Sequence, residues 1–167
     1  DLLNLADFGV PQTRERVLFI GSRDGESIWT PSPTHSCDGS DGLPPWLTLR
    51  QALVDLDPGG HEYCQLPPSK KKWIEMVPEG GNWRDLPIHL QKEALGAAFV
   101  SWGGRSGFCR RLAWDRPAPA LTTRPDSKAT MLAHPEELRP LSVQEYARIQ
   151  QFPDGWSLAG GLPQKYK

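Results

Sequence analysis

The sequence predicts a mixed α/β protein with much irregular structure, and three observations indicate this fold class. A short apolar run suited to a strand occupies residues 17–20. A helical pattern with capping residues begins at Ser142. The 16 glycines and 17 prolines make up 33 of the 167 residues, well above the usual share of about 12%, and this predicts long loops. The length allows one domain, or a small domain with part of another.

The first 30 residues predict a short helix end, a turn, a buried strand over residues 16–20 and an exit at Gly21. Gln12-Thr13-Arg14-Glu15-Arg16 stands directly before the apolar run. Because strand side chains alternate, Arg14 and Arg16 are expected on one side and Glu15 on the other. Guanidinium groups suit phosphate oxygens and base acceptors. The alternative is a surface ion pair with Glu15 or Asp7.

Frequent proline and glycine divide residues 31–108, so only brief helices are expected there. One is predicted over residues 47–56, where Leu49, Leu53 and Leu56 are spaced for one face. A second is predicted over residues 68–76.

The clearest local pattern lies near the end of the chain. Ser142 and Glu145 form a capping box, and Leu141 and Tyr146 can pack across it. The helix must end by Phe152, because proline follows.

Charge is unevenly distributed along the chain. A net charge of −1 and a pI near 6.5 give no global sign of nucleic-acid binding. Residues 103–128, however, hold six basic and two acidic residues, a net charge of +4, which favours phosphate contact. The basic run at residues 70–72 is better explained as a solvated face.

The three cysteines suit a reducing compartment better than a disulfide scaffold. Cys64-Gln65 could mark a nucleophile, but the preceding residue is tyrosine and we do not expect that role. A zinc site from His35, Cys37, His61 and Cys64 would match no standard spacing, so no metal is expected. No run is long and apolar enough for a membrane span, and no leader opens the chain.

Three segments, in order, are similar to motifs of the DNA (cytosine-5) methyltransferases. The first is Asp7-Phe8-Gly9-Val10-Pro11-Gln12-Thr13-Arg14-Glu15-Arg16. The second spans residues 111–123 and includes Arg116-Pro117-Ala118-Pro119-Ala120-Leu121-Thr122-Thr123. The third spans residues 134–153 and includes Glu145-Tyr146-Ala147-Arg148-Ile149-Gln150-Gln151-Phe152-Pro153. Several ordered matches are far more specific than one short pattern.

The chain departs from the family at both ends. It lacks the family's glycine-rich cofactor turn, its Pro-Cys-Gln nucleophile, its Glu-Asn-Val glutamate and its final Asn/Ala-Val-Pro motif, and it begins without methionine. We therefore expect the C-terminal part of a methyltransferase, truncated before the last motif and inactive alone. The alternative is a non-catalytic DNA-binding remnant, and a weaker third possibility is a zinc-stabilised binding module.

The resemblance implies the C-terminal edge of a Rossmann-like, S-adenosylmethionine-dependent methyltransferase domain plus an irregular, loop-rich target-recognition domain. Residues 1–30 would end the catalytic domain, residues 31–130 would form the target-recognition region, and residues 131–167 would return to the catalytic domain. The whole enzyme would methylate C5 of a flipped cytosine in a specific duplex sequence. It would act in the bacterial cytoplasm, in a restriction-modification system or as an orphan enzyme. Its partners would be double-stranded DNA and the missing N-terminal catalytic part, which would bind most of the S-adenosylmethionine.

The resemblance also suggests site residues. Arg14 and Arg16 would support the flipped base, with Arg16 on the base side. The expected DNA contacts are Asn82, Arg84, Arg105, Arg110, Arg111, Thr122, Thr123 and Arg124. Asn82, Arg84 and Arg105 stand beside glycines that allow the backbone close to a duplex. For residues 80–83 an ordinary turn with a core tryptophan remains equally open.

Overall fold

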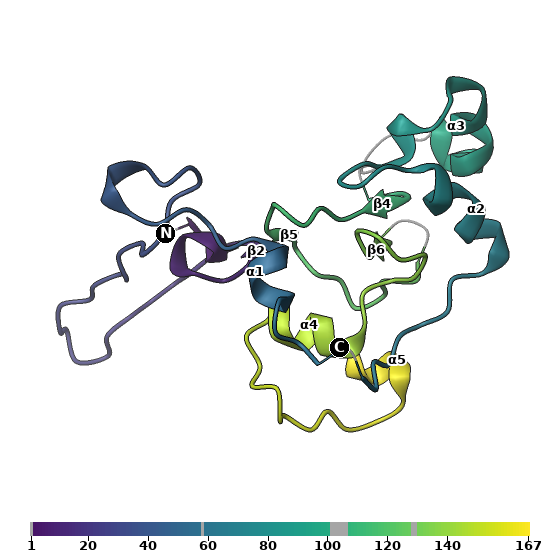
Figure 1. Ribbon diagram of the computed structural model, residues 1–167. Helices are drawn as coiled ribbons and strands as arrows, with labels where there is room; N and C mark the ends of the chain where they lie inside the picture. The colour runs from purple at the N-terminus through teal and green to yellow at the C-terminus, as the bar shows by residue number, and fades with distance from the viewer. Residues whose placement is uncertain (1, 58, 101–106, 128–129) are drawn as a thin grey trace.

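The computed structural model describes residues 2–57, 59–100, 107–127 and 130–167, and it shows a mixed α/β fold with small sheets, as expected. Three two-stranded sheets pair β1 with β3, β2 with β5 and β4 with β6. The strands are β1 (Leu2–Asn4), β2 (Gln12–Thr13), β3 (Glu15–Val17), β4 (Arg110–Arg111), β5 (Ala118–Pro119) and β6 (Leu132–Ala133). The helices are α1 (Leu49–Leu53), α2 (Pro68–Met76), α3 (Ile88–Leu95), α4 (Val143–Ile149) and α5 (Leu162–Lys165), with short 3-10 turns between them. Figure 1 shows the N-terminal segment projecting to one side, with α2 and α3 at one end of the body and α4 and α5 at the other.

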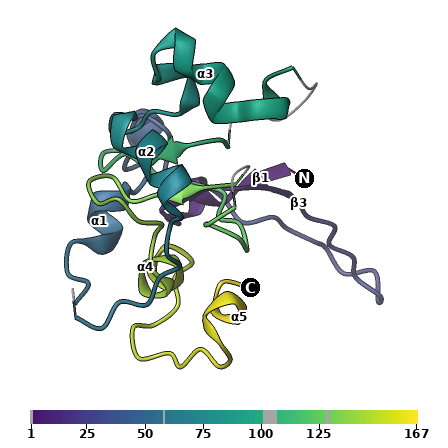
Figure 2. The ribbon, with the colours of Figure 1, turned by 90° about the vertical axis from the view of Figure 1, so that its right-hand side faces the viewer.

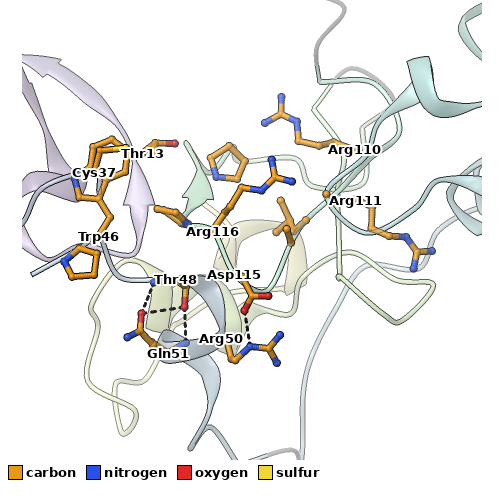
Figure 3. A pocket seen from close by; sticks show the side chains of 16 residues that line it. Thr13, Cys37, Trp46, Thr48, Arg50, Gln51, Arg110, Arg111, Asp115 and Arg116 are labelled. Atoms are coloured by element: carbon orange, nitrogen blue, oxygen red, sulfur yellow. Dashed lines mark hydrogen bonds and ion pairs between the residues drawn. The ribbon is translucent and has the colours of Figure 1, made fainter. Parts of the chain in front are cut away.

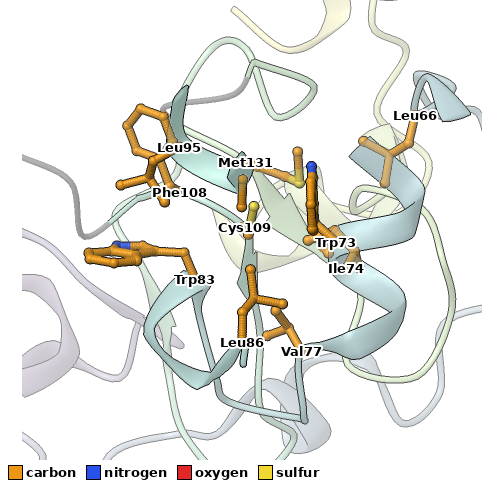
Figure 4. Close-up of a cluster of buried hydrophobic side chains, with 12 residues drawn as sticks. Leu66, Trp73, Ile74, Val77, Trp83, Leu86, Leu95, Phe108, Cys109 and Met131 are labelled. Carbon is orange, nitrogen blue, oxygen red and sulfur yellow. The ribbon is translucent and has the colours of Figure 1, made fainter. Parts of the chain in front are cut away.

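Two hydrophobic clusters lie on the two sides of β6. The first packs α2, α3 and the 3-10 turn Trp83–Asp85 around side chains such as Trp73, Ile74 and Met131 (Figure 4). The second packs α1, β5 and α4 around side chains such as Leu49 and Tyr146. Successive strand residues point to opposite faces, and accordingly Leu132 joins the second cluster while Ala133 joins the first. β6 therefore holds the two halves of the body together.

The predicted helices were found with shifts at their ends. Helix α2 has the predicted bounds, and α1 is shorter than the predicted residues 47–56 because Thr48 caps it and the backbone turns after Leu53. At α4 the capping box is present: the Ser142 hydroxyl accepts from the Glu145 amide, and the Glu145 carboxylate accepts from the Ser142 amide. Helices α3 and α5 were not predicted.

The prediction of a buried strand over residues 16–20 was wrong. Strand β3 ends at Val17, and residues 18–20 are not in a strand. Val17, Leu18, Phe19 and Ile20 are all exposed, Phe19 to 95%. The physical reason is that β3 pairs only with β1, and the chain then leaves the body as a long loop (Figures 1 and 2). No other layer covers this segment among the residues that the structure describes.

In the described ranges, none of the helices has the length and apolar character needed to cross a bilayer.

Candidate nucleic-acid interface

The segment that carries Arg14 and Arg16 is fixed by its neighbour β5. Gln12 is buried, and its side-chain oxygen accepts from the Leu121 amide at 3.3 Å. The Thr13 hydroxyl donates to the Ala118 carbonyl at 3.3 Å, and β2 and β5 run parallel. Two of the segments singled out in the sequence, residues 7–16 and 111–123, thus form one unit. Its geometry is set by buried polar contacts that leave little freedom to shift.

Of the two arginines on this unit, Arg14 is partly buried and Arg16 is exposed. Arg14 stands between β2 and β3, where its amide donates to the Asn4 side chain at 3.0 Å. Arg16 is exposed, and its Nη1 donates to the Glu15 carbonyl at 2.6 Å. Among the described residues, neither guanidinium forms an ion pair with Asp7, Glu15 or any other carboxylate. Both cations are available for an anion.

A cleft of about 800 Å³ opens where β2, the segment before α1 and the segment from β4 to β5 meet (Figure 3). Its walls combine apolar surface with basic side chains. It is lined by Thr13, Cys37, Pro45, Trp46, Thr48, Arg50, Gln51, Gly80, Arg110, Arg111, Leu112, Ala113, Asp115, Arg116, Pro117 and Pro119.

The basic groups of the cleft differ in their pairing. Arg50 donates from Nε to Asp115 at 2.9 Å, and this hydrogen bond holds the pKa of Asp115 below its usual range. Arg110 and Arg116 form no ion pair with any carboxylate in the described part of the chain. Partial burial lowers the pKa of Arg110, but an arginine stays charged at neutral pH. The cleft therefore holds two uncompensated cations.

Gly80 leaves the space that Arg116 occupies. A Cβ atom at this position would come within 2.6 Å of Arg116 Nη2, and the φ angle of Gly80 is +72°, which favours glycine. Any larger residue would displace the guanidinium from the cleft wall.

Arg111 faces away from Arg110 (Figure 3) and into the body of the protein. Its Nη1 donates to the carbonyls of Pro135 and Glu136 at 3.1 and 3.2 Å, and its Nη2 donates to the Ile74 carbonyl at 2.8 Å. These bonds join the end of α2 to the segment after β6. The Arg111 guanidinium, which the sequence predicted to contact DNA, is thus hydrogen-bonded to backbone carbonyls of the protein itself.

Asn82 and Arg84 lie at a turn, as the plainer interpretation of residues 80–83 expected. The Asn82 side chain caps the 3-10 turn by accepting from the Arg84 amide at 3.1 Å, and Trp83 is buried. Arg84 is exposed and stacks 4.7 Å from the centre of the Trp83 ring. Arg105, the third glycine-flanked candidate, lies outside the described residues.

Thr122, Thr123 and Arg124 share one loop after β5. The Thr122 hydroxyl donates to the Thr130 carbonyl at 3.3 Å, and Thr123 is exposed. Arg124 pairs with Asp126 at 3.1 Å, and this bond lowers the pKa of Asp126. A phosphate at Arg124 would have to compete with that carboxylate.

A second charged cluster is buried beneath α4. Arg139 donates to both oxygens of Glu145 at 2.8 Å and also pairs with Glu137. Burial alone would raise the pKa of Glu145, but the bonds from Arg139 hold it below its usual value. Burial lowers the pKa of the neighbouring His134, so that ring is neutral at pH 7. Both carboxylates of the cluster are hydrogen-bonded to Arg139, so we infer that the cluster stabilises the fold.

The structure also places residues of the alternative cysteine and metal sites. Burial raises the pKa of the Cys64 thiol, which disfavours the thiolate that a nucleophile needs. His61 lies against Ser142 and 3.9 Å from Glu145. Within the described ranges, no three side chains of the metal-binding types are grouped to hold an ion.

Several cleft residues were missed from the sequence. Arg116 lay inside the basic window, which was the available signal, but it was not chosen. Arg50 and Trp46 gave no signal, because only the folded chain brings residues 46–50 beside residues 110–116.

Comparisons with known proteins converge on one family. A family model described as C-5 cytosine-specific DNA methylase matches residues 1–167. The chain is 42% identical over 169 residues to the Type II methyltransferase M.Eco47II of Escherichia coli, and 36% identical over 167 residues to M.Sau96I of Staphylococcus aureus. These alignments cover 96% and 100% of this chain but only 38% of each relative. A crystal structure described as that of a prophage-encoded DNA modification methyltransferase from E. coli matches with a TM-score of 0.52 and 18% identity, over 99% of this chain and 53% of that one, which supports the fold.

Proposed function

The chain belongs to the family of C-5 cytosine-specific DNA methylases, and on that basis we propose that it supplies target recognition and DNA contacts to a DNA (cytosine-5) methyltransferase. The enzyme would transfer a methyl group from S-adenosylmethionine to C5 of a cytosine flipped out of a specific duplex sequence. Because the chain spans 38% of the length of the relatives above, the nucleophile and the cofactor site would belong to the rest of the methylase.

The observation that carries this proposal is the cleft with its two uncompensated arginines. Arg110 and Arg116 project into an open, partly apolar space without a carboxylate partner. Phosphodiester oxygens would supply the missing negative charge, and the release of counterions would favour binding. Arg50 is neutralised by Asp115 and would contribute less.

S-adenosylmethionine does not fit this cleft. Its sulfonium carries a positive charge, and the cleft already presents Arg110, Arg116 and Arg50 with one carboxylate among them. We therefore assign the cofactor to other parts of the methylase.

The flipped base would be supported by Arg14 and Arg16. Extruding a base costs a few kcal/mol, which contacts to the extruded nucleotide must offset. Among the described residues neither guanidinium forms an ion pair with a carboxylate, and the buried Gln12 side chain holds the segment that carries them. Arg16, the more exposed of the two, is our choice for the base side, and Arg14 would hold the backbone.

The exposed run at residues 17–20 would be covered by the catalytic part of the methylase. Phe19, two residues beyond the end of β3, is 95% exposed, and this apolar segment follows directly after the proposed base-supporting Arg16. The same contact would bring the nucleophile and the cofactor to Arg14 and Arg16.

A chimera tests the recognition role. In the parent polypeptide, residues 31–130 are replaced by the matching segment of a methylase with a different target sequence. The proposal expects 5-methylcytosine at the donor's target and not at the original one. Methylation that stays at the original target would place recognition outside this chain, and a parent that binds duplex DNA without ever forming 5-methylcytosine would support the DNA-binding alternative.

A further inference from the structure

A 3-10 turn precedes residues 12–16, the segment that carries Arg14 and Arg16. Trp46, which lines the cleft, is hydrogen-bonded to this turn. Asp7 lies in the 3-10 turn Leu5–Phe8 and accepts the Trp46 indole N–H on its Oδ1 at 2.8 Å. Its backbone carbonyl accepts from the amides of Thr34 and His35 at 2.8 and 3.0 Å. One residue thus joins the N-terminal segment to the chain that precedes α1.

Trp46 contacts both the turn and the cleft. Its ring lines the same 800 Å³ space as Arg110 and Arg116, and its indole nitrogen reaches Asp7. Its backbone amide donates to the Ser36 carbonyl at 2.9 Å, so the residue is anchored at both ends. A molecule seated in the cleft would contact a ring that is hydrogen-bonded to the turn.

The turn is also held from the opposite side. Gly9 has a φ angle of +78°, and a Cβ atom there would come within 2.9 Å of the His35 ring. Its carbonyl accepts from Gln151 Nε2 at 3.0 Å, just beyond the end of α4. The bond from Trp46 to Asp7 is therefore one of several contacts that set the orientation of residues 12–16, beside the pairing of β2 with β5.

We propose that Trp46 is a positioning residue that, through its hydrogen bond to Asp7, holds Arg14 and Arg16 in register with DNA bound in the cleft. This inference rests on the proposed function. Asp7 does not line the cleft, so removal of its carboxylate breaks the link and leaves the cleft surface intact. The link would therefore affect the step after binding, in which the base is placed, and not binding itself.

The test uses the full methylase polypeptide with three variants of this link. Asp7→Ala removes the acceptor, Asp7→Asn keeps an oxygen acceptor, and Trp46→Phe keeps a ring without the N–H. Glu136→Ala is the matched control, because Glu136 accepts the Trp114 indole N–H at the same distance of 2.8 Å away from the arginine segment. Single-turnover methyl transfer, duplex affinity, 2-aminopurine fluorescence at the target position and the thermal midpoint are measured for each protein.

The inference expects Asp7→Ala to lower the single-turnover rate and the 2-aminopurine signal about tenfold, the effect of one hydrogen bond to a charged acceptor, with affinity changed less than about twofold. Asp7→Asn should restore most of the rate, Glu136→Ala should match the wild type, and the double variant Asp7→Ala with Trp46→Phe should be no slower than the slower single variant.

Two results would overturn it. One is an Asp7→Ala protein with an unchanged rate. The other is a rate, affinity and thermal midpoint that fall together and are not restored by Asp7→Asn, which is the pattern of a purely structural contact. A wild-type polypeptide that never methylates DNA is a different result: it removes the proposed function, and this inference with it.

Discussion

Replacement of Glu145 by alanine should cost more stability than any single exposed ion pair. Its carboxylate is almost fully buried at 3% exposure, accepts two 2.8 Å bonds from Arg139, and accepts the Ser142 amide at 2.6 Å in the capping box. The variant leaves the buried Arg139 without its main counter-ion and opens the cap of α4. Breaking a buried pair in this way costs about 3–5 kcal/mol, and loss of the capping contact adds about 1 kcal/mol.

Urea unfolding followed by far-UV circular dichroism measures this loss. The control is Glu93→Ala, because Glu93 pairs with Lys72 at the same 2.8 Å distance but on the surface. An exposed pair is worth about 0–1 kcal/mol, so the control should lie close to the wild type. If Glu145→Ala cost no more than Glu93→Ala, the charged cluster beneath α4 would not hold the fold as described.

Four further predictions concern the buried charged groups and the arginines of the cleft. The pKa of His134 is lowered by burial, so as the pH falls below about 6.5 the unfolded state takes up this proton first and stability declines. The pKa of Glu145 is also lowered, so its contribution is complete above about pH 4.3 and is lost below that. Urea midpoints that stay flat as the pH falls from about 7 to about 5 would contradict the His134 prediction, and midpoints that stay flat as the pH falls further below about 4.3 would contradict the Glu145 prediction. Arg111→Met should lower the unfolding free energy by about 3 kcal/mol, because two buried carbonyls and one part-buried carbonyl lose their donor, without changing the salt dependence of DNA binding. Arg110→Ala and Arg116→Ala should each reduce the slope of log affinity against log salt by about one, and an unchanged slope would exclude that residue from phosphate contact.

Local signals predicted local structure well. Helix α2 begins with a proline at its first position, and α4 begins after a capping box. Both helices were found where the sequence predicted them. Helix α3 was missed because Pro87 and Gly96 stand directly at its ends and suggested a loop, although proline before the first turn and glycine after the last are also normal helix boundaries.

Contacts between segments far apart in the sequence were harder to predict from the sequence than local helices. The pairing of β2 with β5 joins residues more than 100 positions apart, and no local preference specifies it. Adjacent arginines at 110 and 111 read alike in the sequence, yet strand alternation turns one to the cleft and the other to three interior carbonyls. The cleft itself depends on the meeting of three separate segments, so Arg50 and Trp46 could be placed in it only from the structure.

The measurement that tests the central claim most directly is single-turnover methyl transfer by the parent polypeptide, wild type and Arg16→Ala, with 5-methylcytosine detected by mass spectrometry and duplex affinity determined in parallel. If Arg16 contacts the base only after flipping, the substitution lowers the rate constant far more than the affinity. A wild-type protein that forms no 5-methylcytosine, or an Arg16→Ala protein that methylates at the wild-type rate, would contradict the account.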